Sequence, residues 1–342
     1  MSELYTCTPR KAKEFIIDCV TSGLVPFVQS SPGIGKSSIM REIANEHNLK
    51  MIDHRLSTSE PSDLTGLPRF VNGFAEFVPF ADLFPVESTP LPEGKDGFML
   101  FMDEFNSASK AVQGASYKLI LDRMTGQHRL HERCIITAAG NLATDRAIVN
   151  PISTAMQSRL VHIHMVVSFK EWLEDVAIKQ NYDPRIISFL SQFESKLMDF
   201  RPDHHGKTFA SPRTWEFMNR LIKGKEVTED KAALYAGTIT SEIAAEFVQY
   251  TKVFASLVPL KVILADPENC AVPADVSLRY ATVTTLLEQV SAETFDPICK
   301  YIRRFDMSFQ ILFFRSAMIR QPQLREHPSF ALAMSALARY IY

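Results

Sequence analysis

The amino-acid sequence predicts an α/β domain with a parallel sheet in its first half and an all-helical region in its second half. Short apolar runs alternate with helical patterns up to about residue 168. This alternation is typical of parallel strands that are joined by helices. After residue 168 the short runs stop, and amphipathic helical patterns continue toward the end of the chain.

Five apolar runs are the predicted strands of the sheet. They occupy residues 24–28, 51–55, 98–102, 134–138 and 161–166. We therefore expect a five-stranded parallel sheet in a first domain formed by residues 1–167.

Two features divide the helical half. Ser168 and Glu171 have the spacing of a capping box, so we expect a helical domain to begin there and to span residues 168–266. Pro267, Asn269 and Pro273 then interrupt the helical pattern. We expect residues 267–342 to form a further helical extension.

Composition limits the classes of protein that the chain can belong to. Its 342 residues suit two or three domains, and 46% hydrophobic with 22% charged residues is typical of a globular chain with an ample core. The net charge of −2 provides no general attraction to nucleic acid or to anionic membranes. Nucleic acid is therefore disfavoured as a partner, although a local basic surface stays compatible with this charge.

The cysteines and the apolar runs bear on location. The five cysteines are scattered and form no C-x-x-C pair, which indicates reduced thiols. The sequence has no run of about 18 apolar residues and no apolar N-terminal leader. We expect a soluble cytoplasmic protein without a membrane span.

The most specific motif, S-S-P-G-I-G-K-S at residues 30–37, lies between the first predicted strand and a helical run. Gly33 and Gly35 allow backbone N–H groups to curl around phosphate oxygens, and the helix N-terminus attracts anions. Lys36 is expected to reach the β- and γ-phosphates, and the Ser37 hydroxyl to ligate Mg²⁺. The motif predicts a P-loop for Mg-ATP. Its predicted nucleotide-binding residues are Ser31, Pro32, Gly33, Ile34, Gly35, Lys36, Ser37 and Ser38.

The motif departs from the usual G-x-x-x-x-G-K-[ST] pattern at its first position, where Ser30 replaces glycine. Serine is small, so we expect the entry to the loop to be preserved. The alternative is a chance match between two unrelated loops. The strand before the motif and the helical run after it favour the P-loop.

Residues 99–104 form an apolar run that ends in two acids. Asp103 is expected to hold Mg²⁺ through its second coordination shell, and Glu104 to polarise the attacking water. A later run ends at Asn141, whose amide could orient that water. The alternative is a turn asparagine that follows Gly140.

Two arginines are further candidates. Arg159 follows Ser158 just before the last predicted strand. Ser211 is a predicted N-cap with Pro212 at the first helical position, which puts Arg213 in the first turn of a helix.

These motifs, in this order, resemble the AAA+ superfamily and, within it, the MoxR-like ATPases, over about residues 9–220. Residues 60–66 (E-P-S-D-L-T-G) resemble the family's segment before its helix-2 insertion. Residues 103–108 (D-E-F-N-S-A) are similar to its D-E-I-N-R-A stretch, and residues 211–213 match its sensor-2 S-P-R element.

The resemblance implies a P-loop AAA+ core with a helical lid, assembled as a homo-hexameric ring with ATP between subunits. It makes Asn141 sensor 1, Arg213 sensor 2 and Arg159 the arginine finger that acts on the next subunit. A guanidinium there would stabilise negative charge on the transferred phosphoryl group. The family has D-R where this chain has Ser158 and Arg159, so Arg146 is the reserve finger. The alternative for Arg159 is a surface arginine that pairs with a local acid.

Two segments are candidates for contact with a partner. Residues 69–77 contain an Asn72-Gly73 turn between alternating apolar residues, which predicts a β-hairpin. They lie where MoxR-like proteins carry the helix-2 insertion, and residues 124–133 lie where that family carries its pre-sensor hairpin. Either segment could line a ring pore or contact a partner, or both could be covering loops.

The resemblance suggests a MoxR-like ATPase that remodels a partner protein with a von Willebrand factor A-type domain. One alternative is an AAA+ motor or loader that acts on nucleic acid. Another is a nucleotide switch or phosphotransferase that works without a ring. The histidine pairs at residues 162 and 164 and at residues 204 and 205 have no third ligand at a suitable spacing, so no metal site is expected there.

Overall fold

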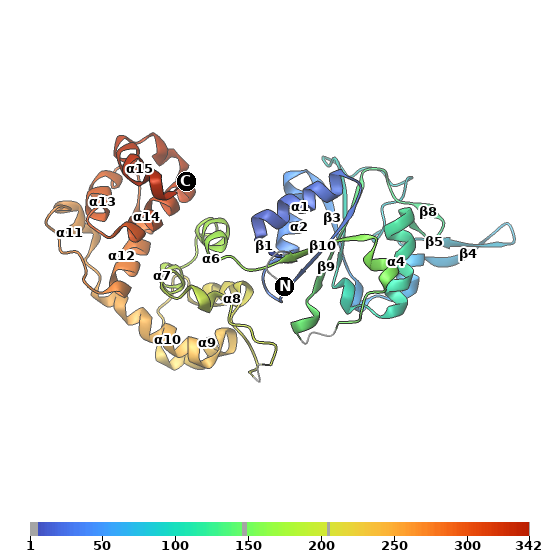
Figure 1. Cartoon of the computed structure of the whole chain (residues 1–342), viewed down its shortest axis with the longest axis horizontal. Coiled ribbons are helices and arrows are strands. Elements are labelled where there is room, and N and C mark those ends of the chain that lie inside the picture. Colours follow the sequence, from blue (N-terminus) through green and yellow to red (C-terminus); the bar gives the residue numbers. More distant parts are fainter. Residues whose placement is uncertain (1–5, 146–148, 204–205, 342) are drawn as a thin grey trace. The chain divides into compact units, whose positions relative to one another are not determined.

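The computed structural model of the chain describes residues 6–145, 149–203 and 206–341 (Figure 1). They pack into two compact units. The first comprises residues up to 168 together with 201–203, and the second comprises the rest. The sequence suggests that residues 168–266 and 267–342 are separate domains. Both segments belong mainly to the second unit, and their division stays a prediction.

A six-stranded parallel sheet forms the centre of the first unit, which confirms the predicted α/β class. Its order is β1–β10–β2–β9–β6–β3. The strands span Thr6–Cys7 (β1), Val25–Ser30 (β2), Leu49–Arg55 (β3), Gly97–Asp103 (β6), Cys134–Asn141 (β9) and Leu160–Met165 (β10). All five predicted strands are present. The prediction of five is one short, because the two-residue β1 at the sheet edge is too brief to produce an apolar pattern.

Strand β6 shows why these residues form an interior strand. All of its residues are buried, and alternate side chains belong to different cores. Phe98, Leu100 and Met102 pack on the face covered by α4 (Lys110–Asp122), whereas Met99 and Phe101 pack on the face covered by α1 (Pro9–Thr21) and α2 (Lys36–Glu46). Each buried side chain of this kind contributes about 1.5–3 kcal/mol to the free energy of unfolding.

Two hairpins are attached to this unit. The first joins β4 (Leu67–Val71) to β5 (Phe74–Val78) and extends away from the sheet (Figure 1). Asn72 and Gly73 have φ values of 50° and 83°, the left-handed pair that a tight two-residue turn requires, so the predicted hairpin is confirmed. The second joins β7 (Met124–Thr125) to β8 (His128–Arg129).

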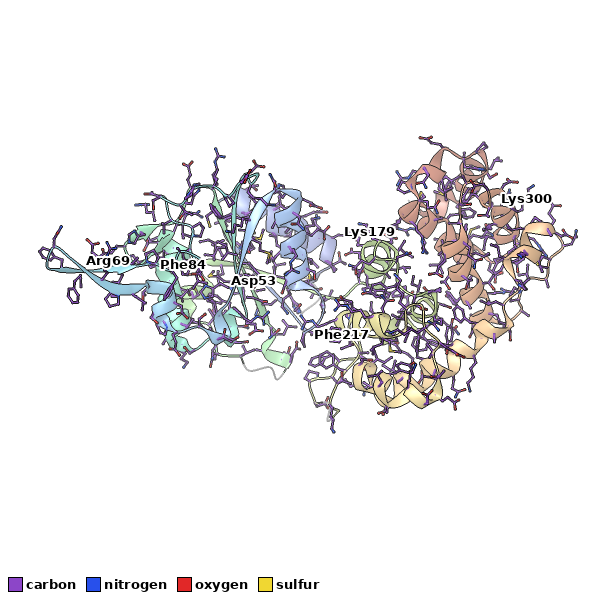
Figure 2. All side chains as sticks on the ribbon, turned by 180° about the vertical axis from the view of Figure 1, so that it is seen from behind. Asp53, Arg69, Phe84, Lys179, Phe217 and Lys300 are labelled. Carbon is purple, nitrogen blue, oxygen red and sulfur yellow. The ribbon has the colours of Figure 1, made fainter. Side chains whose placement is uncertain are left out.

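Short elements connect these parts of the first unit. They are η2 (Leu56–Thr58), α3 (Pro61–Thr65), η3 (Phe105–Ser107), η4 (Ala143–Asp145) and α5 (Thr154–Gln157). Figure 2 shows Phe84, which is buried in the core on the α4 side, and Arg69, which lies on β4.

The described part of the second unit is helical, as predicted. Its α-helices are α6 (Phe169–Glu171), α7 (Pro184–Gln192), α8 (Pro212–Ile222), α9 (Ala232–Ile239), α10 (Ser241–Thr251), α11 (Leu260–Ala265), α12 (Val276–Gln289), α13 (Phe295–Ile302), α14 (Met307–Arg320) and α15 (Pro328–Ile341). A π-helical segment, η5 (Trp172–Ile178), follows α6. The 3₁₀ segments are η6 (Glu194–Leu197), η7 (Glu229–Lys231), η8 (Lys252–Ser256) and η9 (Pro322–Glu326). Among the described residues, no helix has the length and apolar character needed to cross a membrane.

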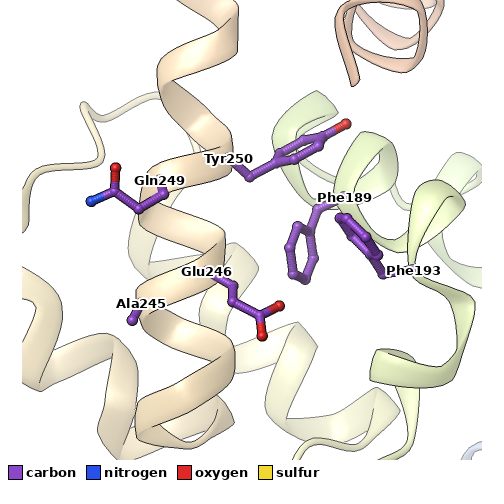
Figure 3. A pocket seen from close by; sticks show the side chains of 6 residues that line it. All are labelled: Phe189, Phe193, Ala245, Glu246, Gln249 and Tyr250. Carbon is purple, nitrogen blue, oxygen red and sulfur yellow. The ribbon is translucent and has the colours of Figure 1, made fainter. Parts of the chain in front are cut away.

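A cavity of about 420 Å³ lies between α7 and α10 (Figure 3). Its lining residues are Phe189, Phe193, Ala245, Glu246, Gln249 and Tyr250. None of the residues that the sequence predicts for a nucleotide site lines this cavity.

Candidate nucleotide-binding site

The loop between β2 and α2 has the backbone geometry of an anion site. Gly33 and Gly35 have φ values of 81° and 112°, which side chains other than glycine rarely adopt. A β-carbon on Gly35 would have only Ser38 Cβ nearby, at 3.9 Å, so its backbone angle rather than crowding requires glycine. Because Gly35 is the N-cap of α2, no side chain caps the first turn, whose N–H groups are donors suited to an anion.

Lys36 connects two neighbouring strands at this end of the sheet. Its Nζ donates to the Ser30 carbonyl oxygen and to Ser30 Oγ, both at 3.1 Å, and to Asn141 Oδ1 at 3.2 Å. Ser30 and Asn141 are register partners in β2 and β9. The structure thus brings together a lysine and an asparagine that are separated by 105 positions in the chain.

Ser30, the departure from the usual motif, has a role of its own. Its side chain is fully buried, accepts a hydrogen bond from Lys36, and donates one to the Ser31 carbonyl oxygen at 3.0 Å. A glycine would supply neither contact. No local pattern in the sequence indicates this role, because it depends on where the lysine side chain folds back.

Asp103 at the end of β6 lies beside the P-loop serine. Ser37 Oγ donates to Asp103 Oδ2 at 3.1 Å, and the Glu104 N–H donates to Asp103 Oδ1 at 2.8 Å. Asp103 is 8% exposed, so its carboxylate is held by these contacts in a nearly buried position. The two residues that the sequence predicts for Mg²⁺ are therefore in direct contact.

Glu104 leaves the strand direction abruptly. Its φ and ψ are 54° and 35°, the left-handed region that non-glycine residues seldom occupy. The half-buried carboxylate accepts a hydrogen bond from the Ser57 hydroxyl of η2. Sequence reasoning missed Ser57, which lies 47 positions from Glu104 and belongs to no motif.

A partly desolvated acid, Asp53, lies on β3, next to β6. Burial, reinforced by the negative charge of Asp103, raises the pKa of Asp53, while Arg55 and Arg41 act in the opposite direction. This acid carries no motif and was not predicted from the sequence. Because burial is the largest cause, the raised pKa reflects mainly the partly desolvated position of this carboxylate beside Asp103.

Arg159 lies between α5 and β10 and is half-buried. Its guanidinium donates to the Ala155 carbonyl oxygen and lies 5.4 Å from the centre of the Tyr117 ring. Its Nε has no hydrogen-bond partner in the described part of the chain. The structure thus shows a carbonyl and an aromatic face around this arginine. Arg146, the reserve candidate, lies outside the described residues.

Arg213 belongs to the second unit, where it lies exposed in the first turn of α8. The predicted cap is present: Ser211 Oγ accepts from the Thr214 N–H at 3.3 Å, and Thr214 Oγ1 accepts from the Ser211 N–H at 2.8 Å. Within the first unit, the structure joins the P-loop with Asp103, Glu104 and Asn141. The roles of Arg159 and Arg213 stay predictions.

Two solved structures of known proteins show a distant likeness to this chain. A mutant of RuvB from Thermotoga maritima has a TM-score of 0.36 and 16% identity, over 84% of this chain and 85% of that chain. NtrX from Brucella abortus, in complex with ADP, has a TM-score of 0.34 and 12% identity, over 96% of this chain and 68% of that chain. No family model and no curated protein matches the sequence. The fold and the site define an α/β protein with a P-loop-type strand–loop–helix.

Proposed function

We propose that this protein is an AAA+ ATPase that binds Mg-ATP at the carboxyl ends of β2, β6 and β9 and hydrolyses it. The observation that carries the proposal is the contact network of Lys36 with Asn141 and of Ser37 with Asp103. In open parallel sheets, ligands bind outside the carboxyl ends of the strands, which is where these residues lie. Lys36 and Ser37 open α2, whereas Asp103 and Asn141 end β6 and β9, and these four residues have the types and positions that phosphoryl transfer requires.

The residues fit Mg-ATP by their chemistry. The left-handed Gly33 and Gly35 and the side-chain-free N-cap of α2 supply backbone N–H donors for phosphate oxygens. Lys36 supplies a positive charge, and the oxygens of Ser37 and Asp103 suit Mg²⁺, which prefers oxygen ligands. When bound, Mg-ATP supplies the γ-phosphoryl group that is transferred to water.

Each remaining side chain has a role in that transfer. Glu104 accepts the proton of the attacking water, and the hydrogen bond from Ser57 orients its carboxylate. Asn141 presents an amide between the lysine and the acids and orients the water. Lys36 neutralises charge that develops on the phosphoryl oxygens.

We further propose a MoxR-like ring in which Arg159 and Arg213 stabilise charge at shared sites. In the described part of the chain, Arg159 is half-buried and forms no ion pair that would neutralise its guanidinium, which is compatible with this role. The exposed Arg213 is compatible with contact beyond its own unit. On this proposal the ring is homo-hexameric and the protein is cytoplasmic.

The work of such a ring would be to remodel a partner protein, for which we propose one with a von Willebrand factor A-type domain. The β4–β5 hairpin supports a protein contact, because Phe70 is 80% exposed and Phe74 is 75% exposed. The base of this hairpin contacts the second hairpin through His128 Nε2 and the Phe77 carbonyl oxygen, 3.1 Å apart. The two hairpins are therefore physically linked.

Steady-state ATP hydrolysis tests the central claim. Lys36→Ala removes the charge that the phosphates need, so we expect turnover to fall at least about 100-fold and nucleotide binding to weaken strongly. Lys50→Ala is the matched control, because Lys50 is an exposed lysine on β3 in the same unit. Normal turnover in Lys36→Ala would refute the proposed function.

A further inference from the structure

Asn106 is a buried polar residue that the proposed reaction does not use directly. It lies in η3, two positions after Glu104, and is 2% exposed. Its Nδ2 donates to the Asn141 carbonyl oxygen at 2.7 Å, and its Oδ1 accepts from the Asn141 N–H at 3.1 Å. One side chain therefore satisfies both backbone groups of Asn141.

This arrangement continues the sheet by means of a side chain. Strands β6 and β9 pair from Phe98 with Cys134 up to Met102 with Ala138, and β9 then runs on to Asn141. A carboxamide has the same donor and acceptor as a peptide group, so Asn106 takes the place of a further β6 residue. On the other side, Asn141 is still paired with β2.

The neighbouring glycine shows that space is reserved for this amide. A β-carbon on Gly140 would lie 2.2 Å from Asn106 Oδ1 and 2.8 Å from Phe27 Cζ. Both distances are too short for a real contact, so any larger residue at position 140 would displace the amide. The Asn106 carbonyl oxygen also accepts from the Asn150 N–H at 2.7 Å, which fixes the backbone that carries the amide.

The amide links two parts of the candidate site. Asn141 contacts Lys36 through its side chain, and Glu104 precedes Asn106 by two positions. We propose that Asn106 is a positioning residue, which holds the Asn141 backbone so that its side-chain amide stays at Lys36 and in register with Glu104. This inference rests on the proposed function, because the reaction that Asn141 serves is ATP hydrolysis.

The first test separates catalysis from binding. Because small displacements of catalytic groups are costly, we expect Asn106→Ala to lower kcat about 10- to 100-fold. The Kd of a fluorescent ATP analogue should change less than about threefold, since Asn106 contacts none of the P-loop donors. Thr125→Val is the matched control: Thr125 is fully buried in the same unit, and its hydroxyl donates to the Leu64 carbonyl oxygen at 2.9 Å rather than to Asn141. Equal kcat in the Asn106→Ala and Thr125→Val variants would overturn the proposal.

The second test asks whether Asn106 acts through Asn141. In an Asn141→Ala background, the amide that Asn106 positions is gone, so adding Asn106→Ala should lower kcat by less than about threefold further. Losses that multiply would show that Asn106 acts by another route, and would overturn the proposal. Where Asn106→Ala does not fold, Asn106→Asp replaces it in both tests, because it keeps the acceptor and the size but removes the donor.

A third readout does not depend on turnover. The Asn141 N–H donates a hydrogen bond to the Asn106 side chain, so its hydrogen exchange, followed by NMR, should be at least about tenfold faster in Asn106→Ala than in Thr125→Val. Unchanged protection of this amide would overturn the proposal even if kcat falls. A wild-type protein that does not hydrolyse ATP would instead refute the proposed function, and the exchange rate would still decide whether Asn106 holds Asn141.

Discussion

At the scale of single residues, the backbone at the end of β6 decides which partner each acid of the candidate site contacts. Asp103 is the last residue of β6 and keeps the strand direction, whereas Glu104 turns into the left-handed region. This single change of backbone directs two successive acids to different partners, Ser37 for Asp103 and Ser57 for Glu104. A left-handed glutamate costs of the order of 1 kcal/mol or more, which is tolerated at functional sites.

Glu104→Gln tests the separation of these two acids. The amide keeps the size of the side chain but cannot accept the proton of water, so we expect ATP binding to persist while kcat falls at least about 100-fold. The measurement pairs single-turnover hydrolysis with binding of a fluorescent ATP analogue. Glu87→Gln, at an exposed position, is the control. Unchanged turnover in Glu104→Gln would assign the water-activating acid to another residue.

Asp53 predicts a pH effect on stability. Burial and the charge of Asp103 raise its pKa in the folded state, so folding favours the protonated form. Stability is then lost as pH rises from the unfolded pKa, about 3.9, through the folded value. We therefore expect Asp53→Asn to raise Tm at pH 7. Near pH 3, below the unfolded pKa of about 3.9, Asp53 is mostly protonated in both the folded and the unfolded state, so the substitution should leave Tm unchanged.

Thermal unfolding at both pH values, followed by circular dichroism, measures this effect. Asp82→Asn, at an exposed aspartate of the same unit, controls for the loss of one negative charge. A rise in Tm that is equal at both pH values would contradict the assigned cause.

Elements differ in how much of them the sequence predicts. The five longer strands and the hairpin turn were predictable, because buried apolar runs and an Asn-Gly pair are local signals. The β1 strand and the π-helical η5 were not, because two residues carry no period and a π-helix shares the helical pattern. Within the site, the P-loop and the acid pair could be predicted from motifs. The roles of Ser57 and Asn106 could not, because they depend on contacts across 47 and 35 positions of the chain.

The N-cap of α8 is a prediction at the scale of one element. Ser211 is 1% exposed, and its Oγ accepts the Thr214 N–H, so Ser211→Ala leaves a buried donor without that partner. We expect the free energy of unfolding of the helical unit to fall by about 1 kcal/mol. Both tryptophans, Trp172 and Trp215, lie in this unit, so intrinsic tryptophan fluorescence during urea unfolding reports on it alone. The exposed Ser195→Ala serves as the control, and equal midpoints for the two variants would contradict the capping role.

At the scale of the whole molecule, the proposal requires that each active site use residues from two copies of the chain. The Glu104→Gln protein should bind ATP without consuming it, so light scattering with Mg-ATP should report about six copies per particle, a closed ring. The same protein without nucleotide should be smaller. A monomer under both conditions would contradict the ring and leave the P-loop assignment intact.

Mixing two inactive variants tests the shared site more directly. Lys36→Ala lacks the phosphate-binding lysine but keeps Arg159, whereas Arg159→Ala keeps the lysine and lacks the arginine. In an equal mixture that assembles at random, a complete site needs an Arg159→Ala subunit to bind ATP through Lys36 and a Lys36→Ala neighbour to supply Arg159. This ordered pair occurs at about one interface in four. We therefore expect turnover to recover to about a quarter of the wild-type rate, because the guanidinium is supplied by the neighbour. No recovery would mean that both residues serve the same subunit, and full activity of Arg159→Ala alone would return Arg159 to a packing role against Tyr117.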